Sequence, residues 1–137
     1  MNPLIRNIIA VVIGWLIGSV INMGLITIGH GFYPIPGIDP NDMEALAAIM
    51  PTLTSEFFLF PFLAHALGTL FGALVAGLIA KSNKMRAALI VGLIFLIGGI
   101  TVNILLPGPF WFAAVDIIFA YIPMAWIGGK IVQKLSS

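Results

Sequence analysis

The 137-residue chain has no cysteine and few charged residues. Because thiols are absent, disulfides, thiolate metal ligands and cysteine nucleophiles are excluded. Charged residues make up 8% of the sequence and hydrophobic residues 61%, and the mean hydropathy is +1.15. Six basic and five acidic side chains cannot cover a soluble fold of this size, so we expect most of the surface to face a lipid bilayer.

The sequence also lacks the motifs that other classes of binding partner require. No basic stretch interleaved with aromatic residues is present, so nucleic acid is excluded as a binding partner. His30 and His65 could ligate haem or a metal, but two histidines without a binding motif are weak support. The acidic residues within 39–44 lack the glycine and the terminal glutamate of a calcium-binding EF-hand loop. We therefore predict no metal and no cofactor.

Four apolar stretches follow one another, each close to the ~20 residues that cross the bilayer core. A polar turn at 81–86 separates the second from the third. The prolines of PGP at 107–109 separate the third from the fourth, because both cannot lie inside one helix. We predict an all-α polytopic membrane protein, one domain built as a four-transmembrane-helix bundle, with spans over residues 8–28, 57–80, 87–106 and 110–132.

The charged residues divide between the two sides of these spans. All six basic residues lie on the side of the termini: Arg6, Lys81, Lys84, Arg86, Lys130 and Lys134. Four of the five acids lie in the long connection, residues 29–56, on the other side. Since positively charged loops stay inside, we expect both termini in the cytoplasm and the 29–56 loop outside.

The outer loop contains its own helix signal, DPNDMEALAAIM at 39–50. Asp39 suits the N-cap, Pro40 the first helical position, and Pro51 ends the run. We predict a short outer amphipathic helix that covers the mouth of the bundle. Nine of the fifteen aromatic residues also lie near this interface, where a membrane belt is the favoured interpretation and a pocket lining the alternative.

Polar side chains inside the spans occur at one depth in the outer half of the membrane. Asn22, His65, Asn103 and Asp116 each lie on the small-residue face of a different span, and Tyr121 is a further candidate. A lone carboxylate in hydrocarbon costs ~2.5–3.5 kcal/mol, so Asp116 should be protonated, hydrated or paired, and His65 is the ionisable partner at its depth. The cluster is either structural hydrogen bonding between helices or a binding site.

Small residues predict where helices approach closely. GWLIG at 14–18 and GTLFG at 68–72 are GxxxG motifs, and the second continues into further small residues at four-residue spacing. Such faces let backbones meet, either within one chain or between protomers. The candidate packing residues are Gly14, Gly18, Gly68, Gly72 and Ala76.

The assembled pattern resembles a family of small bacterial integral membrane proteins with four spans. The resemblance covers nearly the whole chain and is carried by GSVINMG (18–24), DPNDME (39–44), FPFLAHALGTLFGA (60–73), PGPFWF (107–112) with Asp116 beyond it, and YIPMAWIGGK (121–130). It implies the four-helix fold and the bacterial inner membrane. It implies no activity.

Three functions stay open. The favoured one is a non-enzymatic membrane protein that acts through helix association, as a homo-oligomer or an accessory subunit of a membrane complex. The alternative is a small transporter or binding protein for an ion, a proton or a small molecule, using the polar cluster. An intramembrane enzyme with His65 as general base and Asp116 orienting it is disfavoured, because no nucleophile or metal set accompanies the pair. No catalytic residue is assigned.

Overall fold

A computed structural model describes all 137 residues and shows an entirely helical chain. Four segments are long and apolar enough to cross a membrane: Pro3–Phe32, Ser55–Ile79, Lys84–Leu105 and Phe110–Leu135. The predicted all-α class, with four helical segments of membrane-spanning length, is confirmed. The helices are α1 (Pro3–Phe32), α2 (Met43–Ile49), α3 (Leu59–Ile79), α4 (Lys84–Leu105), α5 (Phe110–Phe119) and α6 (Ile122–Leu135), with 3-10 turns at Met50–Thr52 and Ser55–Phe58.

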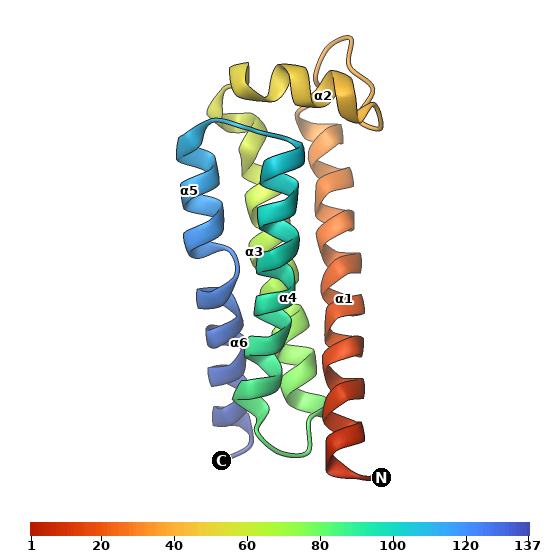
Figure 1. Cartoon of the computed structure of the whole chain (residues 1–137), viewed down its shortest axis with the longest axis vertical. Coiled ribbons are helices and arrows are strands. Elements are labelled where there is room, and N and C mark those ends of the chain that lie inside the picture. Colours follow the sequence, from red (N-terminus) through yellow and green to blue (C-terminus); the bar gives the residue numbers. More distant parts are fainter.

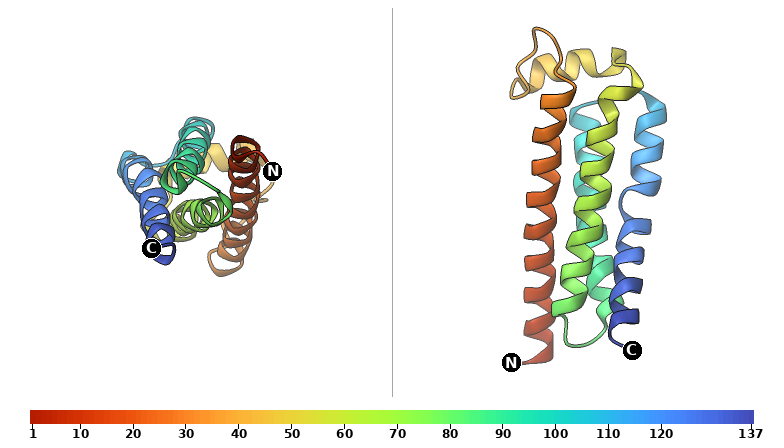
Figure 2. Two further views of the ribbon diagram at one scale, coloured as in Figure 1. Left: turned by 90° about the horizontal axis from the view of Figure 1, so that it is seen from below. Right: turned by 180° about the vertical axis from the view of Figure 1, so that it is seen from behind.

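The long helices stand side by side, and α2 lies across one end of them (Figure 1). Both termini lie at the opposite end. Helix α3 is the centre of the packing, because it contacts α1, α4 and α6 (Figure 2). Helix α1 packs chiefly on α3, so most of its circumference is left outside the protein core.

Glycines bring α1 and α3 into backbone contact. A Cβ added at Gly18 would lie 2.5 Å from the carbonyl oxygen of Gly68, and one added at Gly72 would lie 2.7 Å from that of Gly14. Ala76 completes this contact, since its Cβ is 2.7 Å from the position a Cβ of Gly14 would take. The two GxxxG motifs therefore face each other within one chain, the first of the two arrangements that the sequence left open.

The fourth apolar segment is interrupted between α5 and α6. Pro123 has no N–H to bond to the carbonyl of Phe119, and its ring clashes with that turn, so a continuous helix is disfavoured there. The chain leaves helical geometry at Tyr121, where φ is −116° and ψ is −80°. This break turns the Tyr121 ring into the protein, where its side chain is buried.

Helix α2 begins later than the sequence predicted. Its N-cap is Asp42, whose carboxylate accepts a hydrogen bond from the Ala45 N–H at 3.1 Å, so the expectation of Asp39 as N-cap was wrong. Asp39 instead accepts from the Asn41 N–H at 2.9 Å and shapes the preceding turn. An aspartate bonded to its own backbone two residues on favours a turn over a helix start, which explains the shift.

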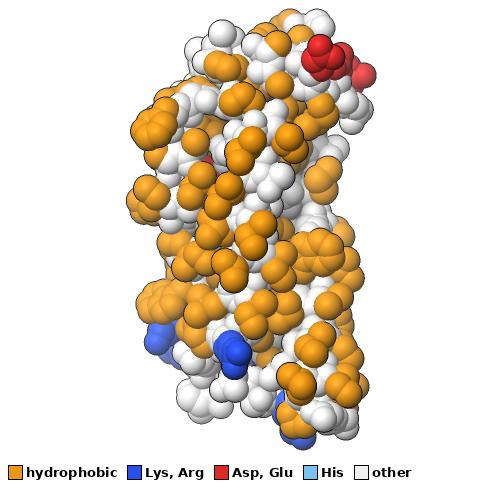
Figure 3. All heavy atoms as spheres, viewed as in Figure 1, with side chains coloured by type: hydrophobic (Ala, Val, Ile, Leu, Met, Phe, Trp, Pro, Cys, Tyr) orange, Lys and Arg blue, Asp and Glu red, His pale blue; other side chains and the backbone are white.

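The charged residues gather at opposite ends of the molecule (Figure 3). The basic residues lie at the end with the termini, and the acids of the 39–44 segment lie beside α2. Two of the cations close the C-terminus of α3: Arg6 Nε donates to the Ile79 carbonyl at 2.7 Å, and Lys84 Nζ donates to that of Ala80 at 2.9 Å. These bonds satisfy carbonyls that a helix end leaves without partners.

Candidate functional site

Asp116 of α5 is the centre of a buried polar network. Its side chain is fully buried, and its Oδ1 lies 2.7 Å from Nδ1 of His65 on α3. Its Oδ2 accepts hydrogen bonds from Tyr121 OH at 2.9 Å and from Asn103 Nδ2 of α4 at 3.0 Å. Three side chains from three separate parts of the fold thus converge on one carboxyl group, which offsets much of the cost of burying it.

The hydrogen-bond pattern favours one arrangement of protons in this network. A carboxylate only accepts, whereas the Tyr121 hydroxyl and the Asn103 amide donate to Asp116. With Nδ1–H of His65 as a third donor, Asp116 accepts all three hydrogen bonds, and this is the arrangement that we favour. The second ring nitrogen, Nε2, makes no hydrogen bond within the protein, and in the neutral ring it carries a lone pair.

His65 and Asn103 line a cavity of about 130 Å³ at the α2 end of the bundle. Asn103 donates to both Asp116 and the Gly99 carbonyl, which uses its two N–H groups and leaves its oxygen as an acceptor. Side chains of α2 and the following 3-10 turn cover the cavity. Its aromatic walls come from the residue that follows α1, the turn before α3, α3 and α5: Tyr33, Phe57, Phe60 and Phe112.

Gly99 makes room for the Tyr121 hydroxyl, a role that the sequence analysis missed. A Cβ at this position would overlap the hydroxyl and would lie 2.6 Å from Cε2 of the ring. The Tyr121 ring also stacks on the His65 ring, with centroids 5.7 Å apart and planes 29° apart. The sequence signal was available, since Gly99 lies one turn before Asn103 on the same face.

Asn22 does not join the network, which corrects the expected four-helix cluster. It packs on the α1–α3 contact, where its Cβ is 3.1 Å from the position a Cβ of Gly68 would take. Its side-chain oxygen is buried without a hydrogen-bond partner. Because α1 packs on α3 and has no comparable contact with α5, Asn22 does not reach Asp116. The network therefore joins His65, Asn103, Asp116 and Tyr121.

His30, at the end of α1, lines the same cavity as His65. No three histidine, aspartate or glutamate side chains lie close enough together to hold a metal ion. The cavity lining also contains no serine, threonine, cysteine or lysine. The polar side chains of the lining are thus two imidazoles, one amide and the Tyr33 hydroxyl, within an aromatic and aliphatic wall.

The chain matches no protein-family model, no curated protein and no solved structure. The resemblance to small four-span bacterial membrane proteins therefore depends on the motifs alone. The function is therefore inferred from the geometry and chemistry of the site.

Proposed function

We propose that the chain is a multi-pass protein of the bacterial inner membrane with cytoplasmic termini, and that α2 covers the bundle at the outer surface. The four apolar segments and the basic end that holds both termini support this orientation. The half-buried Leu46 and the exposed Glu44 on α2 fit a helix lying at the edge of the membrane.

The absence of cysteine allows a direct test of this orientation. Glu44→Cys should react with a membrane-impermeant maleimide on intact cells, whereas Ser137→Cys should react only after permeabilisation. The reverse labelling pattern would contradict the orientation, and labelling of both residues on intact cells would contradict cytoplasmic termini.

The cavity beneath α2 is proposed to bind a small molecule that carries a hydrogen-bond donor. The observation that carries this proposal is the arrangement of His65: Asp116 holds one ring nitrogen, and the ring lines an apolar cavity with its other nitrogen unbonded. A carboxylate that orients an imidazole and sets its tautomer is a recurring way to prepare the far nitrogen for a ligand or a proton.

The volume and the charge of the cavity limit which ligands can bind there. At ~30 Å³ for each molecule of liquid water, 130 Å³ holds roughly four non-hydrogen atoms. Nε2 of His65 and the Asn103 side-chain oxygen both accept hydrogen bonds, and four of the five acids of the chain lie toward this end, with no lysine or arginine. Aromatic walls also attract cations. Small primary amines fit best, followed by small alcohols.

Binding is favoured over catalysis and over transport. Catalysis would use the same His65–Asp116 pair, but the cavity supplies no nucleophile beside it. Toward the other end, the bundle closes through fully buried small side chains, among them Ala73, Ala76, Ala88 and Ala125. This packing supports a site open toward α2 over a path across the membrane.

The test titrates detergent-purified protein with propylamine, propan-1-ol and propionate. A ligand of about four non-hydrogen atoms gains at most ~6 kcal/mol, so dissociation constants near 0.1–1 mM are expected and the titration must reach tens of millimolar. The amine should shift the ¹⁵N resonance of His65 Nε2, and His65→Ala should abolish binding measured by calorimetry. No response to any probe, or unchanged binding in His65→Ala, would refute the proposal.

Helix association is the second candidate function, as a homo-oligomer or as a subunit of a larger complex. The exposed apolar surface of α1, which includes Trp15, Leu16 and Val20, favours it. The GxxxG motifs do not support association between chains, because they pack against each other within one chain. Crosslinking in native membranes should then give a discrete higher-mass species, and recovery of monomer alone would remove this candidate.

A further inference from the structure

The basic end of the molecule has two open grooves, one on each side of the first turns of α4. The groove between α4 and α6 has a volume of about 520 Å³, and the groove between α1 and α4 one of about 460 Å³. Asn83, Arg86 and Ile90 line both of them. These three residues therefore form a ridge that separates two neighbouring grooves.

Each groove changes from polar to apolar along its length. Asn83, in the turn that joins α3 to α4, and Arg86, in the first turn of α4, line both grooves at the basic end, and Ser82 lines the groove beside α1. Ile90 and Leu93 lie one and two turns farther along α4, about 6 Å and 10 Å from Arg86 at 1.5 Å per residue. In the other groove, Ile8, Val11 and Val12 of α1 continue the apolar wall.

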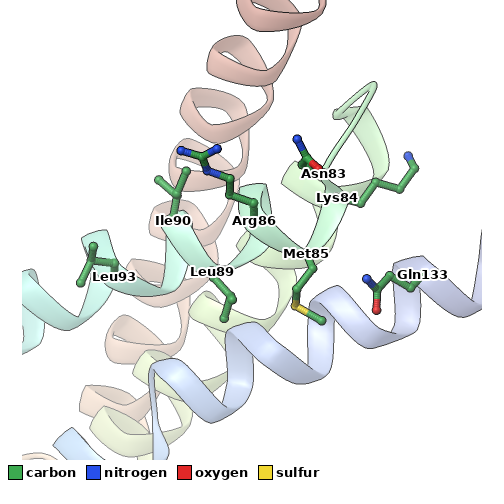
Figure 4. A pocket seen from close by; sticks show the side chains of 8 residues that line it. All are labelled: Asn83, Lys84, Met85, Arg86, Leu89, Ile90, Leu93 and Gln133. Carbon is green, nitrogen blue, oxygen red and sulfur yellow. The ribbon is translucent and has the colours of Figure 1, made fainter.

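The ridge separates side chains that point in different directions (Figure 4). Arg86 and Ile90 lie on the α1 side of α4, whereas Met85 and Leu89 lie on the side of α6, near Gln133. The Arg86 guanidinium extends away from the helix and forms no hydrogen bond or ion pair with the rest of the chain.

No acidic side chain lies at the basic end of the molecule. The one acid–base contact in the structure is His65–Asp116, and the other four acids lie in residues 39–56 toward the opposite end. Lys84 and Arg6 are engaged with helix carbonyls, whereas Arg86 is free. A phosphodiester at the ridge would supply the missing anion, and Arg binds phosphate through two parallel hydrogen bonds.

We propose that this surface binds one anionic diacyl phospholipid, with its phosphate at Arg86 and Asn83 and one acyl chain in each groove. Two grooves that lie on either side of one ridge with a free arginine match a head group with two chains. Basic sites between helices at the cytoplasmic surface are a recognised place for anionic lipid head groups. This inference depends on the proposed membrane orientation and is independent of the His65 cavity.

The test measures lipid adducts by native mass spectrometry of protein in a neutral detergent, with dioleoyl phosphatidylglycerol and dioleoyl phosphatidylcholine added in equal amounts. Phosphatidylglycerol adducts should exceed phosphatidylcholine adducts. Arg86→Gln should lower that preference about tenfold, because a charge-assisted contact is lost. Lys134→Gln removes the same charge from the same end but lies outside both grooves, so its effect should stay below about twofold.

A second variant tests the two-groove geometry. Val12→Trp fills the groove beside α1 and should weaken dioleoyl phosphatidylglycerol binding several-fold, while binding of the single-chain lysophosphatidylglycerol should be unchanged. Equal losses in Arg86→Gln and Lys134→Gln would show diffuse attraction and overturn the site. No preference for phosphatidylglycerol would overturn the anionic class, and wild-type diacyl binding in Val12→Trp would overturn the placement of the second chain.

Discussion

The tautomer of His65 should reverse when Asp116 is replaced by asparagine. In the arrangement favoured here the carboxylate accepts from Nδ1–H, which leaves Nε2 as an unbonded lone-pair acceptor on a ring that lines the cavity. An asparagine amide oxygen can keep the hydrogen bonds from Tyr121 and Asn103, and its NH₂ group then faces His65. Nδ1 must accept that bond, so the ring proton moves to Nε2.

The size of the effect follows from the three contacts of Asp116. Hydrogen bonds between membrane helices contribute about 0.6 kcal/mol on average and at most about 1.7. Losing all three would cost about 2–5 kcal/mol, but asparagine retains two of them and replaces the third by a neutral bond. We therefore expect a stability loss of about 1 kcal/mol, and a loss of amine affinity of tenfold or more because the acceptor has become a donor.

The assay is ¹⁵N NMR of protein labelled at histidine, since the chain contains two histidines and His30→Gln assigns them. Wild type should show a protonated Nδ1 and an unprotonated Nε2 at His65, and Asp116→Asn should show the reverse. Asp42→Asn is the matched control, because it makes the same chemical change at an exposed N-cap that asparagine serves equally well. A wild-type Nε2–H with a bare Nδ1 would refute the reasoning, since Asp116 would then be the donor.

Further predictions concern packing around the network and the α1–α3 contact. Gly99→Ala should destabilise the protein by about 1–3 kcal/mol in thermal or denaturant unfolding, because the new methyl group displaces the Tyr121 hydroxyl. Tyr121→Phe should cost about 0.6–1.7 kcal/mol alone and should recover part of the Gly99→Ala loss; strictly additive losses would contradict this contact. Gly18→Ala should separate α1 from α3 and cost more than 1 kcal/mol, whereas Gly24→Ala, with open space around it, should be neutral or stabilising. Equal effects of the two glycine variants would contradict backbone contact at Gly18.

The sequence predicted the parts of the fold that depend on average composition. The lengths of the apolar stretches and the positions of prolines and charges are sufficient to predict four helical segments, because each of these signals is summed over about twenty residues. Depth and facing also predicted that His65, Asn103 and Asp116 lie at one level, and the structure places the His65 and Asn103 side chains 2.7 Å and 3.0 Å from the Asp116 carboxyl group.

Features that depend on contacts between particular residues could not be predicted from the sequence. Asn22 has the right depth, yet its helix packs chiefly on α3 and has no comparable contact with α5, and helix order in a bundle cannot be read from periodicity. Tyr121 was a candidate from its place in the fourth span, but the helix break that turns its ring inward was not predicted. The N-cap is Asp42 and not the predicted Asp39. Either aspartate could begin a helix, but Asp39 bonds to the Asn41 N–H and forms a turn, whereas Asp42 bonds to the Ala45 N–H.

The central claim, that His65 presents Nε2 to a ligand cavity, is tested most directly by a crystal structure grown in a lipid mesophase with propylamine. The predicted result is density for the amine within hydrogen-bond distance of both Nε2 and the Asn103 side-chain oxygen, with Nδ1 still bonded to Asp116. A cavity filled by protein side chains, or a ring turned so that Nε2 contacts Asp116, would contradict the account.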